Sequence, residues 1–115
     1  MLEMSYMIRL INTADEAVSD TPGRISSLSV EVGELTGVLP EYLEKYFPQA
    51  SAGTRFEGAD FTVIPIPAQA LCLDCDSTFH PSRDNDYRCP SCGSINSRFL
   101  KGRELSVGEI KIEDD

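Results

Sequence analysis

The sequence predicts an α+β protein in which one small sheet is covered by two helices and a four-cysteine zinc lobe is inserted before the last strand. Three observations lead to this fold class. Helical and strand-like patterns alternate along the first half of the chain, all four cysteines fall in one short stretch, and a strand-like segment follows that stretch. We therefore expect two lobes, with residues 1–67 plus 104–115 in one and residues 68–103 in the other.

The first helix is expected from Glu3 to Val18, with residue 2 preceding it. Apolar residues recur there at spacings of three and four, which places them on one face of a helix. They are Met4, Met7, Ile8, Ile11, Ala14 and Val18. The segment Asp20-Thr21-Pro22-Gly23 ends this pattern, because proline and glycine favour a turn. We expect the apolar face, including its methionines, to pack in the core.

Two further segments have the pattern of strands. Residues 24–34 alternate apolar and polar side chains, which predicts a half-buried strand, and residues 60–66 are apolar and β-branched, which predicts a second strand. Pro65 and Pro67 cannot donate hydrogen bonds to a strand ladder, so we place the crossing into the zinc lobe there. The expected inner face of the first strand consists of Leu28, Val30 and Val32.

A second helix is expected between these strands and should begin at Pro40, because proline fits the first turn of a helix. Its predicted inner face consists of Leu39, Leu43, Tyr46 and Phe47. The ring of Pro48 would clash with the carbonyl of Glu44, which predicts that this helix is short or kinked.

The last strand is expected over residues 103–112, beyond the cysteines. Leu105 and Val107 share one phase of the alternation, whereas Ile110 has the opposite phase. Gly108 stands at the point where the phase changes. The sequence therefore predicts a β-bulge at Gly108.

The zinc lobe is organised by two Cys-x-x-Cys pairs, Cys72/Cys75 and Cys89/Cys92. A tetrahedral Zn²⁺ site needs four soft ligands at one point, and two intervening residues let both thiolates of a turn reach the same ion. Gly93 can adopt the positive φ that closes the second turn. Since four thiolates leave no open position on the ion, the pattern predicts a structural zinc rather than a catalytic one.

Two other interpretations of the cysteines are disulfides and a redox motif. Disulfides would suit a secreted chain, but the start of the sequence carries Glu3 and Arg9 and lacks the apolar core of a signal peptide, so we expect a cytoplasmic protein. A redox motif requires one pair that opens a helix behind a strand, not two pairs around a polar loop. His80 lies in that loop, and we expect it to be a solvated side chain rather than a ligand.

The charge balance argues against some functions. The chain has 19 acidic and 10 basic residues and a net charge of −9, whereas nucleic-acid binding requires a cationic face. No stretch approaches the roughly 20 apolar residues of a membrane span. With all cysteines committed to zinc and one histidine, the sequence does not favour an enzyme. A zinc-ribbon adaptor that binds another protein is one candidate function.

Several motifs, in this order and spacing, resemble the HypA/HybF family of hydrogenase nickel-insertion proteins. They are Glu31-Val32-Gly33-Glu34-Leu35-Thr36-Gly37-Val38 with Pro40-Glu41, the two cysteine pairs, and Gly102-Arg103-Glu104-Leu105. The resemblance covers essentially the whole chain and implies a nickel lobe of mixed sheet and two helices that carries the zinc lobe. It also implies a metallochaperone that passes Ni²⁺, with a partner GTPase, to the large subunit of NiFe hydrogenase; some members also serve urease.

The resemblance places the nickel site at the extreme N-terminus, where the family begins Met-His-Glu. Here the corresponding residues are Met1, Leu2 and Glu3, so the imidazole is missing. An amine, backbone amides and an imidazole suit the square-planar nitrogen coordination that Ni²⁺ accepts, whereas Leu2 has no ligand atom in its side chain. We therefore expect one structural Zn²⁺ and weakened binding of the transported Ni²⁺, and we interpret the chain as a variant that has lost this ligand.

Overall fold

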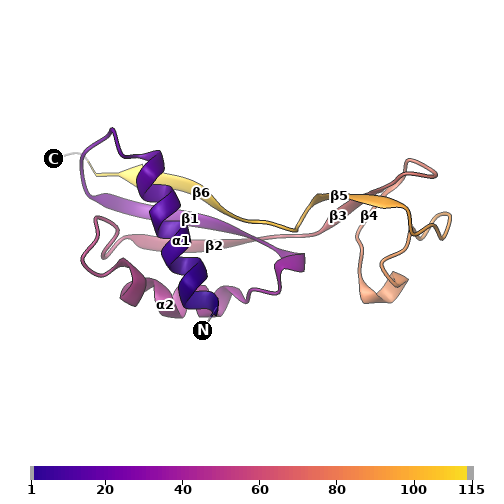
Figure 1. The fold of residues 1–115 in the computed structure, drawn as a ribbon, viewed down its shortest axis with the longest axis horizontal. Coiled ribbons are helices and arrows are strands. Elements are labelled where there is room, and N and C mark those ends of the chain that lie inside the picture. Colours follow the sequence, from indigo (N-terminus) through magenta and orange to yellow (C-terminus); the bar gives the residue numbers. More distant parts are fainter. Residues whose placement is uncertain (1, 114–115) are drawn as a thin grey trace.

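The computed structural model describes residues 2–113, and of Leu2 it describes the backbone only. The molecule is elongated, 56 × 28 × 17 Å, and has two lobes, each built on its own three-stranded sheet (Figure 1). We call them the α/β lobe, with strand order β2-β1-β6, and the cysteine lobe, with strand order β4-β3-β5. The fold class is α+β, as the sequence predicts. Within the described residues, neither helix is long and apolar enough to cross a membrane.

The elements follow the predicted order along the chain. The α/β lobe contains α1 (Leu2–Ala17), β1 (Ile25–Gly33), the 3-10 turn η1 (Glu34–Thr36), α2 (Pro40–Ser51), β2 (Asp60–Ile66) and β6 (Leu105–Ile112). The cysteine lobe contains β3 (Gln69–Cys72), β4 (Thr78–Phe79), the 3-10 turn η2 (Arg83–Asn85) and β5 (Ser97–Lys101). Residue 2 is therefore the first residue of α1 and does not precede the helix. Apolar periodicity could not locate this boundary to one residue. The start of a helix is set by its backbone, whose first N–H groups need no intrahelical partner, and not by the apolar pattern.

The sheet of the α/β lobe is mixed. β1 is its central strand and pairs parallel with β2 and antiparallel with β6. α1 packs against β6, α2 packs against β2, and the two helices contact each other, so together they cover one face of the sheet (Figure 1). The predicted inner residues of β1, Leu28, Val30 and Val32, are buried in this core.

Helix α2 begins at Pro40, as predicted, but differs from the prediction at Leu39 and at Pro48. Leu39 is 47% exposed, since it caps the helix from an extended conformation and does not share the inner face. Pro48 was expected to make the helix short or kinked; α2 does not end there but continues to Ser51, with Pro48 inside it. Packing outweighs the hydrogen bond lost at Pro48: the ring of Phe47 stacks on Phe61 of β2 at 4.4 Å between centroids. The other predicted inner residues, Leu43, Tyr46 and Phe47, are buried.

The predicted bulge is present in β6. The β1–β6 register shifts at Ser29, which faces both Gly108 and Glu109. The N–H of Glu109 donates to Ser29 Oγ at 2.7 Å, and a Cβ at Gly108 would crowd the same hydroxyl. The bulge lets the apolar residues on both of its sides pack against one core. These residues are Leu105, Val107, Ile110 and Ile112.

The chain crosses between the lobes where β2 leads into β3 and where β5 leads into β6 (Figure 1). Two glycines lie close together there: Gly33 is the last residue of β1, and Gly102 lies between β5 and β6. The N–H of Gly33 donates to the carbonyl of Glu104 at 2.9 Å, and the N–H of Leu35 donates to the carbonyl of Gly102 at 2.7 Å. A Cβ on Gly33 would overlap the Gly102 carbonyl, and a Cβ on Gly102 would overlap Ala68. Gly102 can therefore lie this close both to the end of β1 and to Ala68, because neither glycine carries a side chain.

The cysteine lobe has very little hydrophobic core. Its cluster of buried residues consists of Ala70, Cys72, Phe79 and Cys89, so half of it is cysteine. A core of this size is too small to stabilise a lobe by apolar burial alone. The lobe therefore needs a further source of folding free energy, and the cysteines are placed to supply it by binding a metal.

Candidate metal centre

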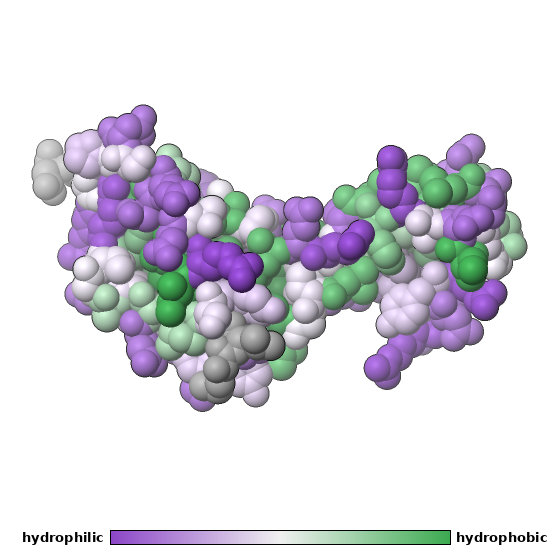
Figure 2. Space-filling view, in the orientation of Figure 1, coloured by the Kyte–Doolittle hydropathy of each residue, from purple (hydrophilic) through white to green (hydrophobic). Residues whose placement is uncertain are grey.

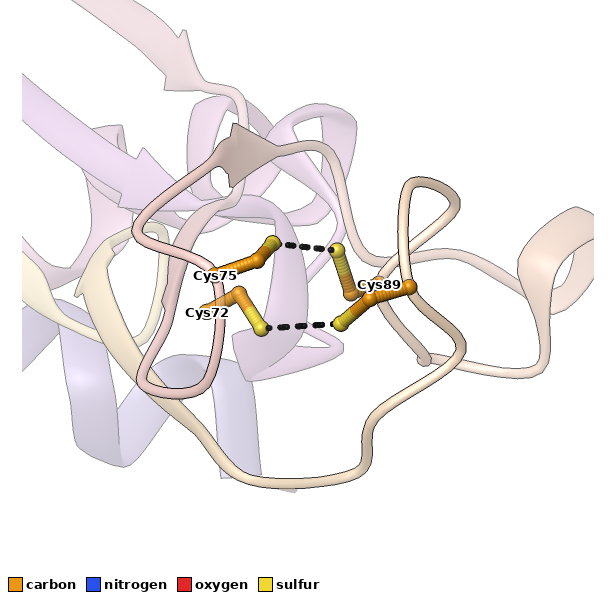
Figure 3. Close-up of side chains that lie close together, drawn as sticks. Cys72, Cys75 and Cys89 are labelled. Carbon is orange, nitrogen blue, oxygen red and sulfur yellow. Dashed lines mark hydrogen bonds between the residues drawn. The ribbon is translucent and has the colours of Figure 1, made fainter.

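The four cysteines converge on one point. Cys72 and Cys75 lie at the end of β3 and in the turn after it, and Cys89 and Cys92 lie in the turn before β5; their sulfurs point toward one another across a small gap (Figure 3). Cys72 Sγ is 3.6 Å from Cys92 Sγ, Cys75 Sγ is 3.6 Å from Cys89 Sγ, and all four sulfurs lie within 4.8 Å of one another. Among the described residues, no second cluster of three potential metal ligands occurs.

These distances fit one tetrahedral ion. A Zn²⁺ ion with Zn–S bonds of about 2.3 Å has sulfur–sulfur edges of about 3.8 Å, close to the two shorter separations. The first cysteine of each pair, Cys72 and Cys89, is buried, and the second, Cys75 and Cys92, is exposed. Soft thiolates in this arrangement suit Zn²⁺, and four of them complete its coordination.

The two cysteine turns have the same backbone hydrogen bonds. In the second turn the N–H of Gly93 donates to the Cys89 carbonyl at 2.7 Å, and the N–H of Cys89 donates to the Ser94 carbonyl at 3.0 Å. The first turn repeats the pattern, with bonds from Asp76 N–H to the Cys72 carbonyl (2.9 Å) and from Cys72 N–H to the Ser77 carbonyl (2.8 Å). Each turn thus presents its two sulfurs in the same way.

Each turn is closed by a residue in the left-handed backbone conformation, four positions after the first cysteine of the turn. Gly93 has φ +76°, as the sequence predicts. Asp76 occupies the equivalent position of the first turn with φ +63°. Aspartate is one of the few residues other than glycine that tolerate this conformation. The sequence did not predict the conformation of Asp76, because glycine alone served as the signal for a positive φ.

Polar side chains beside the cysteines join the two turns. The carboxylate of Asp74, in the first turn, accepts a hydrogen bond from the hydroxyl of Ser94, in the second. The same oxygen lies 3.5 Å from Asn96 Nδ2, and Ser94 Oγ accepts the N–H of Asn96 at 2.9 Å. Groups of this kind orient metal ligands. Sequence reasoning missed them, although their polar character next to both pairs was visible.

The thiols differ in their readiness to ionise. Hydrogen bonds to the hydroxyl and amide of Ser77 lower the pKa of Cys75 to about 6. The amide of Ser94 lowers the pKa of Cys92, but the neighbouring sulfurs, led by Cys72, outweigh it and raise the pKa to about 12. Four adjacent thiolates repel one another, so full ionisation requires a cation among them.

The residues predicted to bind nickel are only partly described. Met1 lies outside the described residues, as does the side chain of Leu2; Glu3 is half-buried in the first turn of α1. His80 does not belong to the cluster of potential metal ligands. Its side chain is 52% exposed, as expected of a solvated residue, and its Nε2 also lies 2.7 Å from Glu34 Oε1, a contact that the sequence did not predict.

A family model described as hydrogenase/urease nickel incorporation, metallochaperone, HypA matches residues 1–112, which include both lobes and all four cysteines. The chain belongs to the HypA family. This family consists of hydrogenase maturation factors and nickel metallochaperones. The resemblance seen in the motifs is thereby confirmed.

Two curated relatives and one solved structure are similar to this chain over nearly their whole length. The hydrogenase maturation factor HypA of Roseiflexus sp. (strain RS-1) is 34% identical over 116 residues, which cover 100% of this chain and 94% of the relative. That of Geobacter sulfurreducens is 34% identical over 113 residues, covering 98% and 100%. The solution structure of the nickel metallochaperone HypA from Helicobacter pylori has a TM-score of 0.73 at 19% identity and covers 98% of each chain, which shows the same fold.

Proposed function

We propose that this chain is a cytoplasmic nickel metallochaperone that delivers Ni(II), with a partner GTPase, to the large subunit of NiFe hydrogenase. The observation that carries the proposal is the family match over residues 1–112, whose description names nickel incorporation into hydrogenase or urease. The elongated two-lobed shape suits a carrier, since both lobes present surface to partners. No pairing of nucleophile and base suggests catalysis in the described residues, so we propose a carrier rather than an enzyme.

The four cysteines would hold a structural Zn²⁺ in this protein. Cys72, Cys75, Cys89 and Cys92 supply four thiolates at separations that suit a tetrahedral ion. Zinc bound there would cross-link the two cysteine turns and neutralise part of the negative charge of the four thiolates. The chain itself positions the sulfurs through the two matching turns and the Asp74–Ser94 hydrogen bond.

The N-terminus would be a weakened nickel site. Leu2 and Glu3 lie in the first turn of α1, where N–H groups have no intrahelical acceptor. Their amides can therefore lose protons to a metal without breaking the helix. However, Leu2 contributes no imidazole, so the terminal amine of Met1 is left without the strong nitrogen donor that would anchor Ni²⁺ while these amides ionise.

A protein-binding zinc-ribbon adaptor is the alternative function, and Leu2 is the observation that favours it. An adaptor of this kind would use the same folded lobes but would not carry nickel. The two functions differ in one measurable consequence, which is whether the hydrogenase large subunit receives nickel through this chain.

Deletion of the gene in the source organism tests the proposal. We expect the large subunit to accumulate without nickel at low external nickel, as measured by metal analysis of the purified subunit. The wild-type chain should restore nickel partly, and Leu2→His should restore it at lower external nickel. Nickel content of the large subunit that does not change on deletion would contradict nickel delivery and favour the adaptor.

A further inference from the structure

The two cysteine turns must stay together to hold a metal ion. Residues 72–77 form the first turn and residues 89–94 form the second. Each turn supplies two of the four sulfurs, which face one another across a small gap (Figure 3). An ion bound there loses half of its ligands when the turns move apart. The contacts between the turns therefore limit how fast the ion can leave.

Apolar packing contributes little to these contacts. The buried cluster of the cysteine lobe has four members, and two of them are cysteines. Leu73 and Ile95, the bulky apolar residues of this region, are 57% and 71% exposed. On the cysteine lobe, at the right of Figure 2, apolar side chains lie at the surface beside strongly hydrophilic ones. Polar contacts must therefore hold the turns together.

Asp74 and Ser94 make such a contact. The hydroxyl of Ser94 donates a hydrogen bond to the carboxylate of Asp74. Among the described residues, this is the one side-chain hydrogen bond that joins residues 72–77 to residues 89–94, apart from the contacts between sulfurs. The hydroxyl is oriented for this role, because it also accepts the N–H of Asn96 at 2.9 Å and keeps its proton for the carboxylate. We call the side chains of Asp74 and Ser94 the clasp.

The clasp lies beyond the last backbone bond between the turns. The paired residues of β3 and β5 end at Cys72 and Ser97, and the N–H of Leu73 then donates to the Asn96 carbonyl at 2.9 Å. Within the described part of the chain, no backbone hydrogen bond joins the two turns further on. The clasp therefore acts at the point where the turns would begin to separate.

We propose that Asp74 is a positioning residue of the metal centre, which slows the loss of the bound ion by holding the second turn through Ser94. The proposal rests on the four-cysteine zinc site proposed above. Asp74 does not belong to the cluster of potential ligands, so its removal leaves four sulfurs to bind the ion. Its effect should therefore appear in the rate of metal release and not in the number of ligands.

Transfer of zinc from the zinc-loaded full chain to excess EDTA tests the proposal. Asp74→Ala and Ser94→Ala should each accelerate the transfer about tenfold, the lower end of the change in metal affinity typical of groups that orient ligands. Asp74→Asn keeps an oxygen that accepts from Ser94, so it should accelerate the transfer less than about threefold. Asp84→Ala is the matched control and should leave the rate unchanged, since Asp84 is an exposed carboxylate of the same lobe, in η2.

A double variant separates the hydrogen bond from other effects of the two substitutions. Asp74→Ala and Ser94→Ala remove the same bond, so the chain that carries both should release zinc no faster than either single variant. Co²⁺ bound in place of zinc should have the same visible absorption spectrum in every variant, because four thiolates remain its ligands. If Asp74→Ala does not load with zinc, Ser94→Ala provides the same test by a smaller change.

The possible failures are distinguishable. Release from Asp74→Ala and Ser94→Ala as slow as from the wild-type chain would overturn the clasp and leave the zinc site intact. Equal acceleration by Asp74→Asn and Asp74→Ala would also overturn it, because the charge and not the hydrogen bond would then act. Additive effects in the double variant would have the same meaning. A purified wild-type chain without zinc would contradict the zinc site itself, and the clasp with it.

Discussion

His80 Nε2 lies 2.7 Å from Glu34 Oε1, and this contact joins the cysteine lobe to the α/β lobe. The same carboxylate oxygen accepts the N–H of Ala68, at the crossing between the lobes, at 2.9 Å. The side chains of His80 and Glu34 are 52% and 42% exposed, and pairs so exposed typically contribute below about 1 kcal/mol. The contact therefore bears on how the lobes are oriented more than on global stability.

Replacing Glu34 by alanine should loosen the junction between the lobes. The N–H of Ala68 loses its acceptor, so its hydrogen exchange should accelerate about tenfold, and small-angle scattering should show a broader range of shapes. The free energy of unfolding should change by less than about 1 kcal/mol. Glu44→Ala is the control, since Glu44 is an exposed glutamate on α2. Unchanged exchange at Ala68 in Glu34→Ala would refute the role of this carboxylate.

Acid should weaken the same junction. The hydrogen bond from the Ala68 amide, followed by that from His80, lowers the pKa of Glu34 below its ordinary 4.5. A carboxylate with a lowered pKa stabilises the folded state above its unfolded pKa of about 4.3, and this contribution is lost as the pH falls through the lower folded value. The ¹⁵N shift of Ala68 should follow this titration with a midpoint below 4.5. A midpoint at or above 4.5 would contradict the assignment.

A side chain at Gly102 should be strongly destabilising. Gly102 has φ +98°, and a Cβ there would overlap the backbone of Ala68. Gly102→Ala should lower the free energy of unfolding by more than about 2 kcal/mol in urea denaturation. Gly53→Ala is the matched control, because Gly53 has φ +79° with open space around it. It should cost only about 1 kcal/mol. Equal effects of the two substitutions would mean that the crossing is not tightly packed.

Loss of one zinc ligand should unfold the cysteine lobe alone. We propose that residues 68–103 form a unit that depends on zinc, whereas residues 1–67 with 104–115 form a unit with its own core. Cys89→Ala should abolish stoichiometric zinc binding, and the amide NMR signals of the cysteine lobe should lose their chemical-shift dispersion. The helical circular dichroism of α1 and α2 should remain. Ser91→Ala, an exposed change in the same turn, should retain zinc. Full zinc content in Cys89→Ala would refute four-cysteine ligation.

Local patterns predicted much of this fold. Alternation placed Leu28, Val30 and Val32 on the buried face of β1, and the change of phase around Gly108 located the bulge in β6. These features depend on neighbouring residues, so they are visible in short windows of sequence. The convergence of the cysteines was predictable for the same reason, since each pair forms one turn.

Features that depend on distant residues were not predictable. The contact of Glu34 with His80 joins residues 46 positions apart, and no periodicity connects them. Pro48 disfavours a helix locally, yet α2 continues because Phe47 packs on Phe61. The motif glycines at 33 and 102 were recognisable, but the reason for them, a close approach of two crossing segments, required the structure.

Nickel titration of the zinc-loaded chain tests the central claim most directly, because the claim depends on one residue of the N-terminal site. Isothermal titration should show weak or undetectable nickel binding in the wild-type chain. Leu2→His should raise the affinity at least about 10–100-fold, the factor typical of a single group that supports a metal site. Zinc content and unfolding midpoint should be the same in both. Equal nickel affinity in the two chains would contradict the account, since nickel would then bind elsewhere than at Met1, Leu2 and Glu3.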